Sequence, residues 1–291
     1  MRFVRLAAII MAGLLPIVLL SAACGKRGAG ARTFELHGQV LAVRDTQAVI
    51  KHDEIKGFMP AMTMPYRVRD RELLRGTTAG DLITATLVVS DNDAWLTRIE
   101  KTGSAPITTP VPEPSATAGV SLLQSGDPVP DTQLTNEQGE PIALTSWRGS
   151  AVAITFIYTR CPLPQFCPLL DRRFAAVQRI VAADPALHGR VHLLSVSFDP
   201  DADTPAVLRA HAAKLGADPA VWRFATAPRD VVDRFAARFA VNVIREADRT
   251  ITHNLRTAVI APSGRVFAIY DGTEWTPQQI AEDLGRSLAA R

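Results

Sequence analysis

The sequence predicts a two-domain protein in which a small all-β domain precedes a larger α/β domain. Three observations lead to this prediction. The chain has 291 residues, which is enough for two domains. Short β-rich runs fill residues 33–103, and alternating strand and helix patterns fill residues 120–291. Between them, residues 104–119 are rich in proline, serine, threonine and alanine, so we expect a semi-rigid linker there.

The first 23 residues have the pattern of an export signal. Arg2 and Arg5 precede an uncharged apolar stretch from Leu6 to Leu20, and small residues then lead to Cys24. The segment resembles a bacterial lipoprotein signal peptide, in which Cys24 becomes the lipidated first residue. The alternative is an uncleaved anchor helix, which needs about 20 apolar residues to span a bilayer. Both interpretations place the body of the protein at the periplasmic face of the membrane and attached to it.

Charge and motif content narrow the classes of partner and activity. The formal net charge is +3, and loss of Arg2 and Arg5 with the leader would leave about +1. The sequence has no run of Lys and Arg with interleaved aromatic residues, so we expect no nucleic-acid partner. It also contains neither G-x-S-x-G nor H-E-x-x-H, which argues against a hydrolase.

The all-β region contains five runs with the composition of short strands. These runs cover residues 33–43, 47–52, 62–68, 81–90 and 94–101. Five short strands within about 70 residues are typical of a small closed barrel, so we expect an OB-like β-barrel over 33–103. We expect Trp95 to pack in its core.

The α/β region opens its regular pattern at residues 151–159, a continuous apolar run of the kind that forms a buried central strand. Residues 191–198 form a second such run. Helical spacing follows over 168–183, 205–215, 229–239 and 277–290, and residues 255–261 and 265–270 flank a hairpin turn. This order of elements predicts a thioredoxin-like domain over 120–291.

Two cysteines lie on the turn from the first apolar strand into the first helix. Cys161 follows the strand and Cys167 precedes the helix, where free N–H groups and the positive end of the helix dipole favour thiolate. Thiolate is both a nucleophile and a soft metal ligand. We therefore consider a metal site, a redox disulfide between Cys161 and Cys167, or a plain stabilising disulfide in an exported protein. We expect the proline-containing turn itself to be exposed.

The motifs around these cysteines resemble those of the Sco/SenC family of thioredoxin-fold copper proteins. They are F-I-Y-T-R-C-P at 156–162, C-P at 167–168, S-F-D-P at 197–200 and D-T-P at 203–205. The resemblance extends from about residue 126 to the C-terminus, and it implies that Cys161, Cys167 and His253 are copper ligands. It also implies a role in assembling the copper centre of cytochrome c oxidase, with an oxidase subunit or another copper chaperone as partner. Five residues separate the cysteines here, against three in the usual family pattern.

A second candidate site lies in the all-β region, where every methionine outside the leader falls in one short window: Met59, Met62 and Met64. Met62 and Met64 are two residues apart, so on a strand they share a face. Thioether sulfur prefers Cu(I), and His52 at the end of the preceding run would complete a site. The alternative is that the methionines only fill the barrel core.

The same segment resembles the periplasmic copper-binding domains of the CusF type, in which a histidine and a Met-x-Met pair hold copper on a small five-stranded barrel. This resemblance implies that His52, Met62 and Met64 are copper ligands. Met59 would be an additional ligand or a hydrophobic lid.

The leading functional hypothesis is an exported, membrane-tethered copper metallochaperone with two copper sites, whose linker lets metal pass between its domains or to a partner. The alternative is a membrane-tethered thiol–disulfide oxidoreductase that uses Cys161 and Cys167 but has no task for His253. A third hypothesis is peroxide reduction by one reactive cysteine, for which Arg160 is the adjacent cation.

Overall fold

The structure is a computed structural model that describes residues 31–59, 61–90, 93–107, 120–245 and 251–289. The predicted leader with Cys24, and residues 108–119 of the predicted linker, lie outside the described residues. From Ala31 onward the chain forms one compact unit. Within the described ranges, no helix is both long and apolar enough to cross a membrane.

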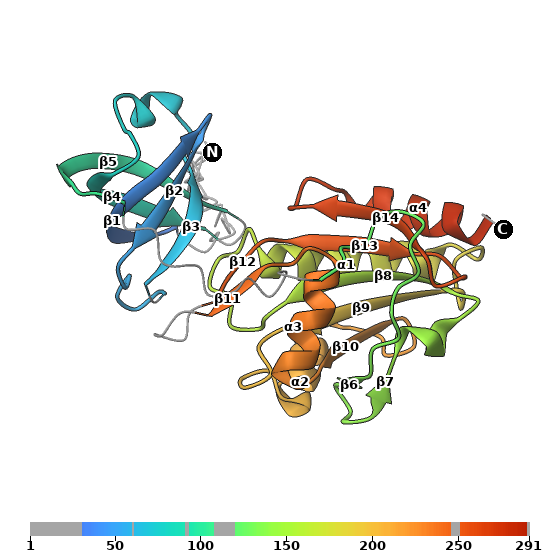
Figure 1. Ribbon diagram of the computed structural model, residues 1–291. Helices are drawn as coiled ribbons and strands as arrows, with labels where there is room; N and C mark the ends of the chain where they lie inside the picture. The colour runs from blue at the N-terminus through green and yellow to red at the C-terminus, as the bar shows by residue number, and fades with distance from the viewer. Residues whose placement is uncertain (1–30, 60, 91–92, 108–119, 246–250, 290–291) are drawn as a thin grey trace, which may run out of the picture. The chain divides into compact units, whose positions relative to one another are not determined.

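The N-terminal sheet consists of five antiparallel strands in the order β3-β2-β1-β4-β5 (Figure 1). The strands are β1 (Arg32–Arg44), β2 (Gln47–His52), β3 (Met62–Arg67), β4 (Asp81–Val89) and β5 (Ala94–Ser104). Burial alternates along β2 and β3, so that one face of each strand packs into a hydrophobic core. The five predicted strands are therefore confirmed, each to within a few residues at its ends.

Two details of the predicted barrel are wrong. Within the described residues, β3 and β5 form no ladder with each other, and a single isolated bridge joins Val68, just after β3, to Leu96 of β5, so the barrel is not closed by a ladder. Strand β3 ends at Arg67, and the chain then enters the short helix η1 (Arg71–Leu74), which leaves little strand to pair with β5. Trp95 is also not in the core, because Ala94 and Leu96 take the inward positions. Trp95 faces outward, and the Arg69 guanidinium stacks 3.3 Å from its ring centroid.

The second sheet has seven strands in the order β14-β13-β8-β9-β10-β6-β7. The strands are β6 (Leu134–Asn136), β7 (Pro141–Ile142), β8 (Ala151–Ile157), β9 (Val191–Ser197), β10 (Trp222–Thr226), β13 (Arg256–Ile260) and β14 (Val266–Asp271). Strands β8, β9 and β10 are parallel, and the outer strands are antiparallel to their neighbours. Every residue of β8 is buried, as expected for a central strand covered on both faces.

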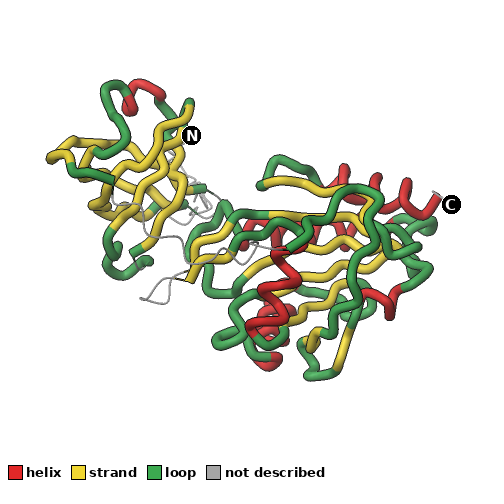
Figure 2. The backbone as a smooth tube through the Cα atoms, in the orientation of Figure 1, coloured by secondary structure: helices red, strands yellow, loops and turns green. Residues whose placement is uncertain are grey.

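Helices cover both faces of this second sheet. They are α1 (Cys167–Ala183), α2 (Pro205–Leu215), α3 (Arg229–Arg238) and α4 (Pro277–Ala289). In the view of Figure 1, α3 lies in front of the sheet and α1 behind it, and α1 packs against both α2 and α4. In Figure 2 the longer red segments are these four helices, and the short red segment in the N-terminal part is η1 (Arg71–Leu74). The predicted α/β class is confirmed, and four predicted helices and four predicted strands are present.

Candidate metal sites

The first candidate site, which we call the methionine site, consists of His52, Met62 and Met64 on two paired strands. His52 ends β2 and lies opposite Met62 of β3, while Ile50 lies opposite Met64. All three candidate ligands point into the core, with exposed fractions of 2 % for His52, 8 % for Met62 and 7 % for Met64. The predicted shared face of Met62 and Met64 is thus formed, and the strand register brings the imidazole beside Met62.

A backbone contact fixes the orientation of the His52 ring. Its Nδ1 lies 2.6 Å from the carbonyl oxygen of Asp53, so Nδ1–H donates there and Nε2 is the ring nitrogen that could bind a metal. Gly38 of β1 is paired with His52 across the sheet. A Cβ at Gly38 would lie 2.6 Å from the Lys51 carbonyl oxygen and 2.8 Å from the His52 Cα. The close approach of β1 beneath the histidine therefore requires glycine at position 38.

Met59 lies beside this site and is engaged by a residue that the sequence did not single out. The hydroxyl of Tyr66 donates to the Met59 sulfur at 3.7 Å, and the Tyr66 ring meets His52 edge-on with 5.6 Å between ring centroids. Burial raises the pKa of Tyr66 well above its usual value, so the phenol stays protonated and remains a donor. The Met59 sulfur is thus already engaged by a hydroxyl group. This contact favours Met59 as a hydrophobic lid over Met59 as an additional copper ligand.

The second candidate site, the cysteine site, consists of Cys161, Cys167 and His253. Cys167 is the first residue of α1, with 1 % of its surface exposed, and Cys161 is half-buried on the turn that follows β8. Both are free thiols. The expectation of an exposed turn is wrong, because Leu163 is also buried and packs against the hydrophobic cluster of the N-terminal sheet that includes Met62 and Met64.

His253 enters the cysteine site from a short strand pair that the sequence did not predict, β11 (Val243–Arg245) and β12 (Ile251–His253). Its Nε2 lies 3.9 Å from Cys167 Sγ, and its Nδ1 lies 3.0 Å from the Asn254 carbonyl oxygen. Nδ1–H donates to that carbonyl, which leaves the Nε2 lone pair directed at the thiol. Tyr158 and Phe198 lie against the ring, with centroids 5.5 Å and 4.6 Å away.

Burial controls the protonation of the whole site. Desolvation among these rings lowers the pKa of His253 to about 4, so the imidazole is neutral at physiological pH and is available as a ligand. The Cys167 thiol and nearby backbone N–H groups donate hydrogen bonds that lower the pKa of Cys161, whereas burial raises the pKa of Cys167. The helix terminus thus does not give both cysteines thiolate character, because at Cys167 desolvation exceeds the dipole effect.

The spacing of Cys167 and His253 is compatible with a shared metal. Bonds of about 2.3 Å to sulfur and about 2.0 Å to nitrogen allow the two ligand atoms to lie up to about 4.3 Å apart, and they are 3.9 Å apart. Within the described residues, no group of three or more His, Cys, Asp or Glu side chains already has the geometry of a metal site. Cys161 and Cys167 are hydrogen-bonded, and Cys167 lies near His253, so the three side chains are neighbours that do not yet have the geometry of a metal site.

Two aspartates from the turn after β9 hold the start of the cysteine turn in place. Asp203 is fully buried and accepts hydrogen bonds from the Thr159 backbone N–H, the Thr159 hydroxyl and the Ser197 hydroxyl. Asp199 pairs with the guanidinium of Arg160 at 2.6 Å. The predicted helix over 205–215 is confirmed as α2; Thr204 caps it through the Val207 N–H, and Asp203 holds the cysteine turn.

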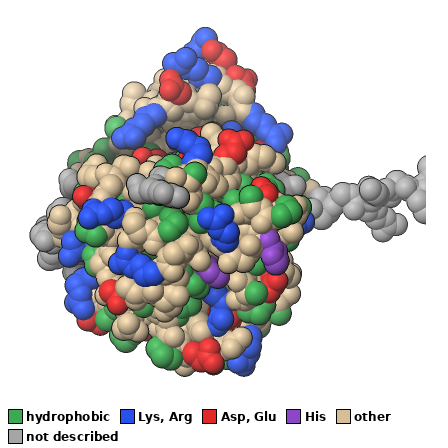
Figure 3. Space-filling model, turned by 90° about the vertical axis from the view of Figure 1, so that its right-hand side faces the viewer, with side chains coloured by type: hydrophobic (Ala, Val, Ile, Leu, Met, Phe, Trp, Pro, Cys, Tyr) green, Lys and Arg blue, Asp and Glu red, His purple; other side chains and the backbone are tan. Residues whose placement is uncertain are grey.

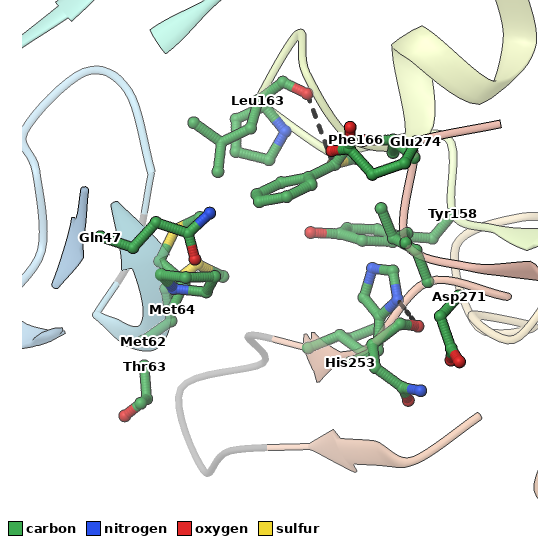
Figure 4. A pocket seen from close by; sticks show the side chains of 18 residues that line it. Gln47, Met62, Thr63, Met64, Tyr158, Leu163, Phe166, His253, Asp271 and Glu274 are labelled. Atoms are coloured by element: carbon green, nitrogen blue, oxygen red, sulfur yellow. Dashed lines mark hydrogen bonds between the residues drawn. The ribbon is translucent and has the colours of Figure 1, made fainter. Parts of the chain in front are cut away.

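Both candidate sites open onto one pocket of about 370 Å³. Met62 and Met64 line it from β3, and Tyr158, Cys161 and His253 line it from the second sheet and its turns. Figure 4 shows the two methionines facing Tyr158 and His253 across this pocket, with Leu163 and Phe166 along its border. The structure therefore brings together two ligand sets that are about a hundred residues apart in sequence.

Comparisons with known proteins agree with both resemblances. The sequence model of the SCO1/SenC family matches residues 124–289, which is more than half of the chain. The model of the copper binding periplasmic protein CusF matches residues 33–101. The chain is 26 % identical over 145 residues to the SCO1 protein homolog of Bacillus subtilis, covering 49 % of this chain and 72 % of that protein.

Solved structures show the same fold in the second region. A SCO1/SenC family lipoprotein from Bacillus anthracis str. Ames has a TM-score of 0.51 at 25 % identity, covering 59 % of this chain and 99 % of that one. BsSco, a member of the Sco family of cytochrome c oxidase assembly proteins, has a TM-score of 0.50 at 24 % identity, covering 58 % of this chain and 99 % of that one. The thioredoxin-like fold predicted for residues 120–291 is thereby confirmed.

Proposed function

The chain belongs to the SCO1/SenC family, and on this premise we propose that it is a copper metallochaperone that carries copper at two sites. The observation that carries the proposal is the convergence of Cys167 and a neutral His253 at 3.9 Å, with Cys161 on the adjoining turn. Two thiols and an imidazole form a soft ligand set that suits copper. In this proposal copper is cargo, so the site has to release it as well as bind it.

The second copper site in this proposal is the methionine site. His52, Met62 and Met64 supply one imidazole and two uncharged thioethers, and all three side chains are buried. Uncharged soft ligands favour Cu(I) over harder divalent ions. The match of residues 33–101 to a copper binding periplasmic protein supports the same ligand set.

The place of action and the recipient follow from the leader and from the relatives. We propose that the protein is exported and held at the periplasmic face of the membrane through lipid on Cys24 or through an anchor helix. The similar structure from Bacillus anthracis is a lipoprotein, which supports the lipid. We propose further that the copper is delivered during cytochrome c oxidase assembly, to an oxidase subunit or to another copper chaperone, in keeping with the family of BsSco.

The test is a Cu(I) competition titration of the reduced full chain in detergent, beside Cys161→Ser, Cys167→Ser and His253→Ala. We expect each substitution to weaken the cysteine site by about tenfold or more, since each removes one of three ligands. The exposed His188→Ala is the matched control and should leave the affinity unchanged. Equal affinity in all four variants would refute copper binding at this site.

A second candidate function, thiol–disulfide exchange, is favoured by one observation. Cys161 is half-exposed with a lowered pKa, and Cys167 lies behind it and donates to it, which is the arrangement of an attacking and a resolving thiol. This function needs both cysteines and does not need His253. Disulfide reductase activity that survives His253→Ala but is lost in both cysteine variants would support it over the chaperone.

A further inference from the structure

The pocket lies between the methionine site and the cysteine site. If each site exchanged copper only with solvent or with partners, neither would need a space shared with the other. Its lining includes members of both ligand sets: Met62 and Met64 on one side, Cys161 and His253 on the other. Much of the remaining lining is apolar, with Pro162, Leu163 and Phe166 among its residues. A largely apolar space between two soft ligand sets would limit the contact of Cu(I) with water and oxidants during a transfer.

The contacts on the two sides hold the ligand sets close to each other. Leu163, which lies between the two cysteines in sequence, is 2 % exposed because it packs into the cluster that contains Met62 and Met64. Cys161 and Phe166 pack against the same cluster. On the other side of the pocket, β12, which ends in His253, contacts β3, which carries both methionines. The cysteine turn thus packs against the methionine site through Leu163, Cys161 and Phe166.

We propose that Cu(I) passes directly from the methionine site to the cysteine site of the same chain through this pocket. The proposal rests on the proposed function, since it assumes that both sites bind copper. The copper bonds to Met62, Met64 and His52 are replaced one at a time by bonds to Cys161, Cys167 and His253. Copper stays Cu(I) throughout, and each thiol that becomes a ligand releases its proton to solvent, so no oxidant or reductant is needed.

Ligand chemistry sets the direction of this transfer. The donor site offers only neutral thioethers and an imidazole, whereas the acceptor site offers thiolates, which are anionic and bind Cu(I) more strongly. Copper that enters at the N-terminal sheet therefore moves toward the cysteines. The five-residue turn between the cysteines contains Leu163, so this turn also serves as the contact with the donor site.

The test is the rate at which copper reaches the cysteines, followed by the ultraviolet absorption of the Cu(I)–thiolate bond in the reduced full chain in detergent. Half an equivalent of Cu(I) is mixed in a stopped-flow instrument at several protein concentrations. Transfer within one chain predicts a phase whose rate constant does not change with protein concentration and which is absent in a Met62→Leu/Met64→Leu chain. A rate proportional to concentration, or an identical phase in the methionine variant, would overturn the proposal.

A mixing experiment in trans provides the reference. A Cys161→Ser/Cys167→Ser chain loaded with Cu(I) is the donor, and a reduced Met62→Leu/Met64→Leu chain is the acceptor. Here we expect only slow, concentration-dependent transfer. If no thiolate absorption develops in any chain, the cysteine site does not bind copper and the proposed function fails. If absorption develops equally in cis and in trans, the function stands and the direct path is wrong.

A charge placed in the pocket tests the path without removing a ligand. Gln47 is exposed, lines the pocket from the start of β2 and ligates nothing in either set. Gln47→Arg should slow the first-order phase by about tenfold or more, because a fixed positive charge a few ångström away repels Cu(I). The matched control is Gln138→Arg in the exposed turn between β6 and β7, which should have no effect. Equal rates in the two variants would contradict the path.

Discussion

At the scale of single residues, the protonation of His253 decides whether the cysteine site offers a complete ligand set. The ring lies against Tyr158 and Phe198, and desolvation lowers its pKa from 6.5 to about 4. A histidine with its usual pKa would be partly protonated in a mildly acidic compartment and would lose copper there. The buried ring keeps Nε2 free of a proton over that whole range.

The lowered pKa also predicts how acid affects folding. Between about pH 6.5 and 4 the unfolded chain binds a proton at His253 that the folded chain does not, so stability falls as the pH falls through this window. The slope should stay below about 1.4 kcal/mol per pH unit, because the ring is partly open to the pocket. Denaturant titrations at several pH values should show that His253→Gln flattens the slope and that the exposed His188→Gln does not. A steeper slope in His253→Gln would contradict this account.

Gly38 is the residue that most directly limits substitution near the methionine site. Any Cβ at this position would lie within 3 Å of the backbone of Lys51 and His52. We predict that Gly38→Ala pushes β1 and β2 apart and costs about 1–3 kcal/mol of stability, by the overpacking that such a contact requires. Gly103→Ala on β5 is the control, since its nearest neighbours are 3.6 Å or more away. Thermal unfolding and Cu(I) affinity of the methionine site measure both effects, and an unchanged Gly38→Ala would refute the prediction.

At the scale of elements, the turn from β8 into α1 is positioned by a buried carboxylate from a different part of the chain. Asp203 accepts three hydrogen bonds, two from Thr159 and one from Ser197, and so connects the ends of β8 and β9. We predict that Asp203→Ala lowers the free energy of unfolding by about 2–4 kcal/mol, because buried donors lose their acceptor.

The control for this substitution is its near neighbour Asp201, which is exposed and pairs with the exposed Arg229. Asp201→Ala should change stability by less than about 0.5 kcal/mol. Denaturant titration gives both values, and Cu(I) titration should show a weaker cysteine site in the Asp203 variant alone. Equal behaviour of the two variants would show that the carboxylate does not position the turn.

Elements with a long, strong pattern could be predicted from the sequence, and short ones could not. The helix expected at 168–183 begins at Cys167, one residue earlier, and the strand expected at 191–198 ends at Ser197. Strand β10 (Trp222–Thr226) escaped prediction because five residues between two helices carry too little periodicity to separate from a loop. The three-residue strand β12, which positions His253, gives no periodic signal at all.

The candidate ligands could be predicted because their residue types are themselves the signal. Sulfur and imidazole groups in short motifs indicate soft-metal chemistry whatever the fold is. Their surroundings could not be predicted in the same way. Three contacts exist only in the folded chain, and no local sequence pattern marks them. They join Asp203 to Thr159, Tyr66 to Met59, and Leu163 to the N-terminal sheet. The S-F-D-P and D-T-P motifs at 197–205 mark Asp199 and Asp203, but they do not say that these side chains contact the cysteine turn.

At the scale of the whole molecule, the net charge is small, and both signs of charge occur together on the face drawn in Figure 3. The formal net charge is +3, and Figure 3 shows basic and acidic side chains interspersed over one face of the protein. A mixed surface of this kind gives little long-range attraction to a polyanion.

Attachment to the membrane is a separate prediction for the intact chain. If Cys24 is lipidated, Cys24→Ala should abolish incorporation of labelled fatty acid, because the thiol is the attachment point. Without the lipid, the chain should either keep its leader uncleaved or be released from the membrane. Mass spectrometry of the mature N-terminus and membrane fractionation measure both. An unlabelled wild-type chain of full length would instead support the anchor helix.

The central claim is that one chain holds copper at two independent sites, and elemental analysis of the reduced, copper-saturated full chain tests it most directly. The account predicts two copper ions per chain, one of which is lost in Cys161→Ser/Cys167→Ser and the other in Met62→Leu/Met64→Leu. A single copper that persists when both cysteines are replaced would contradict the account. Thiol–disulfide exchange would then become the leading function of the second region.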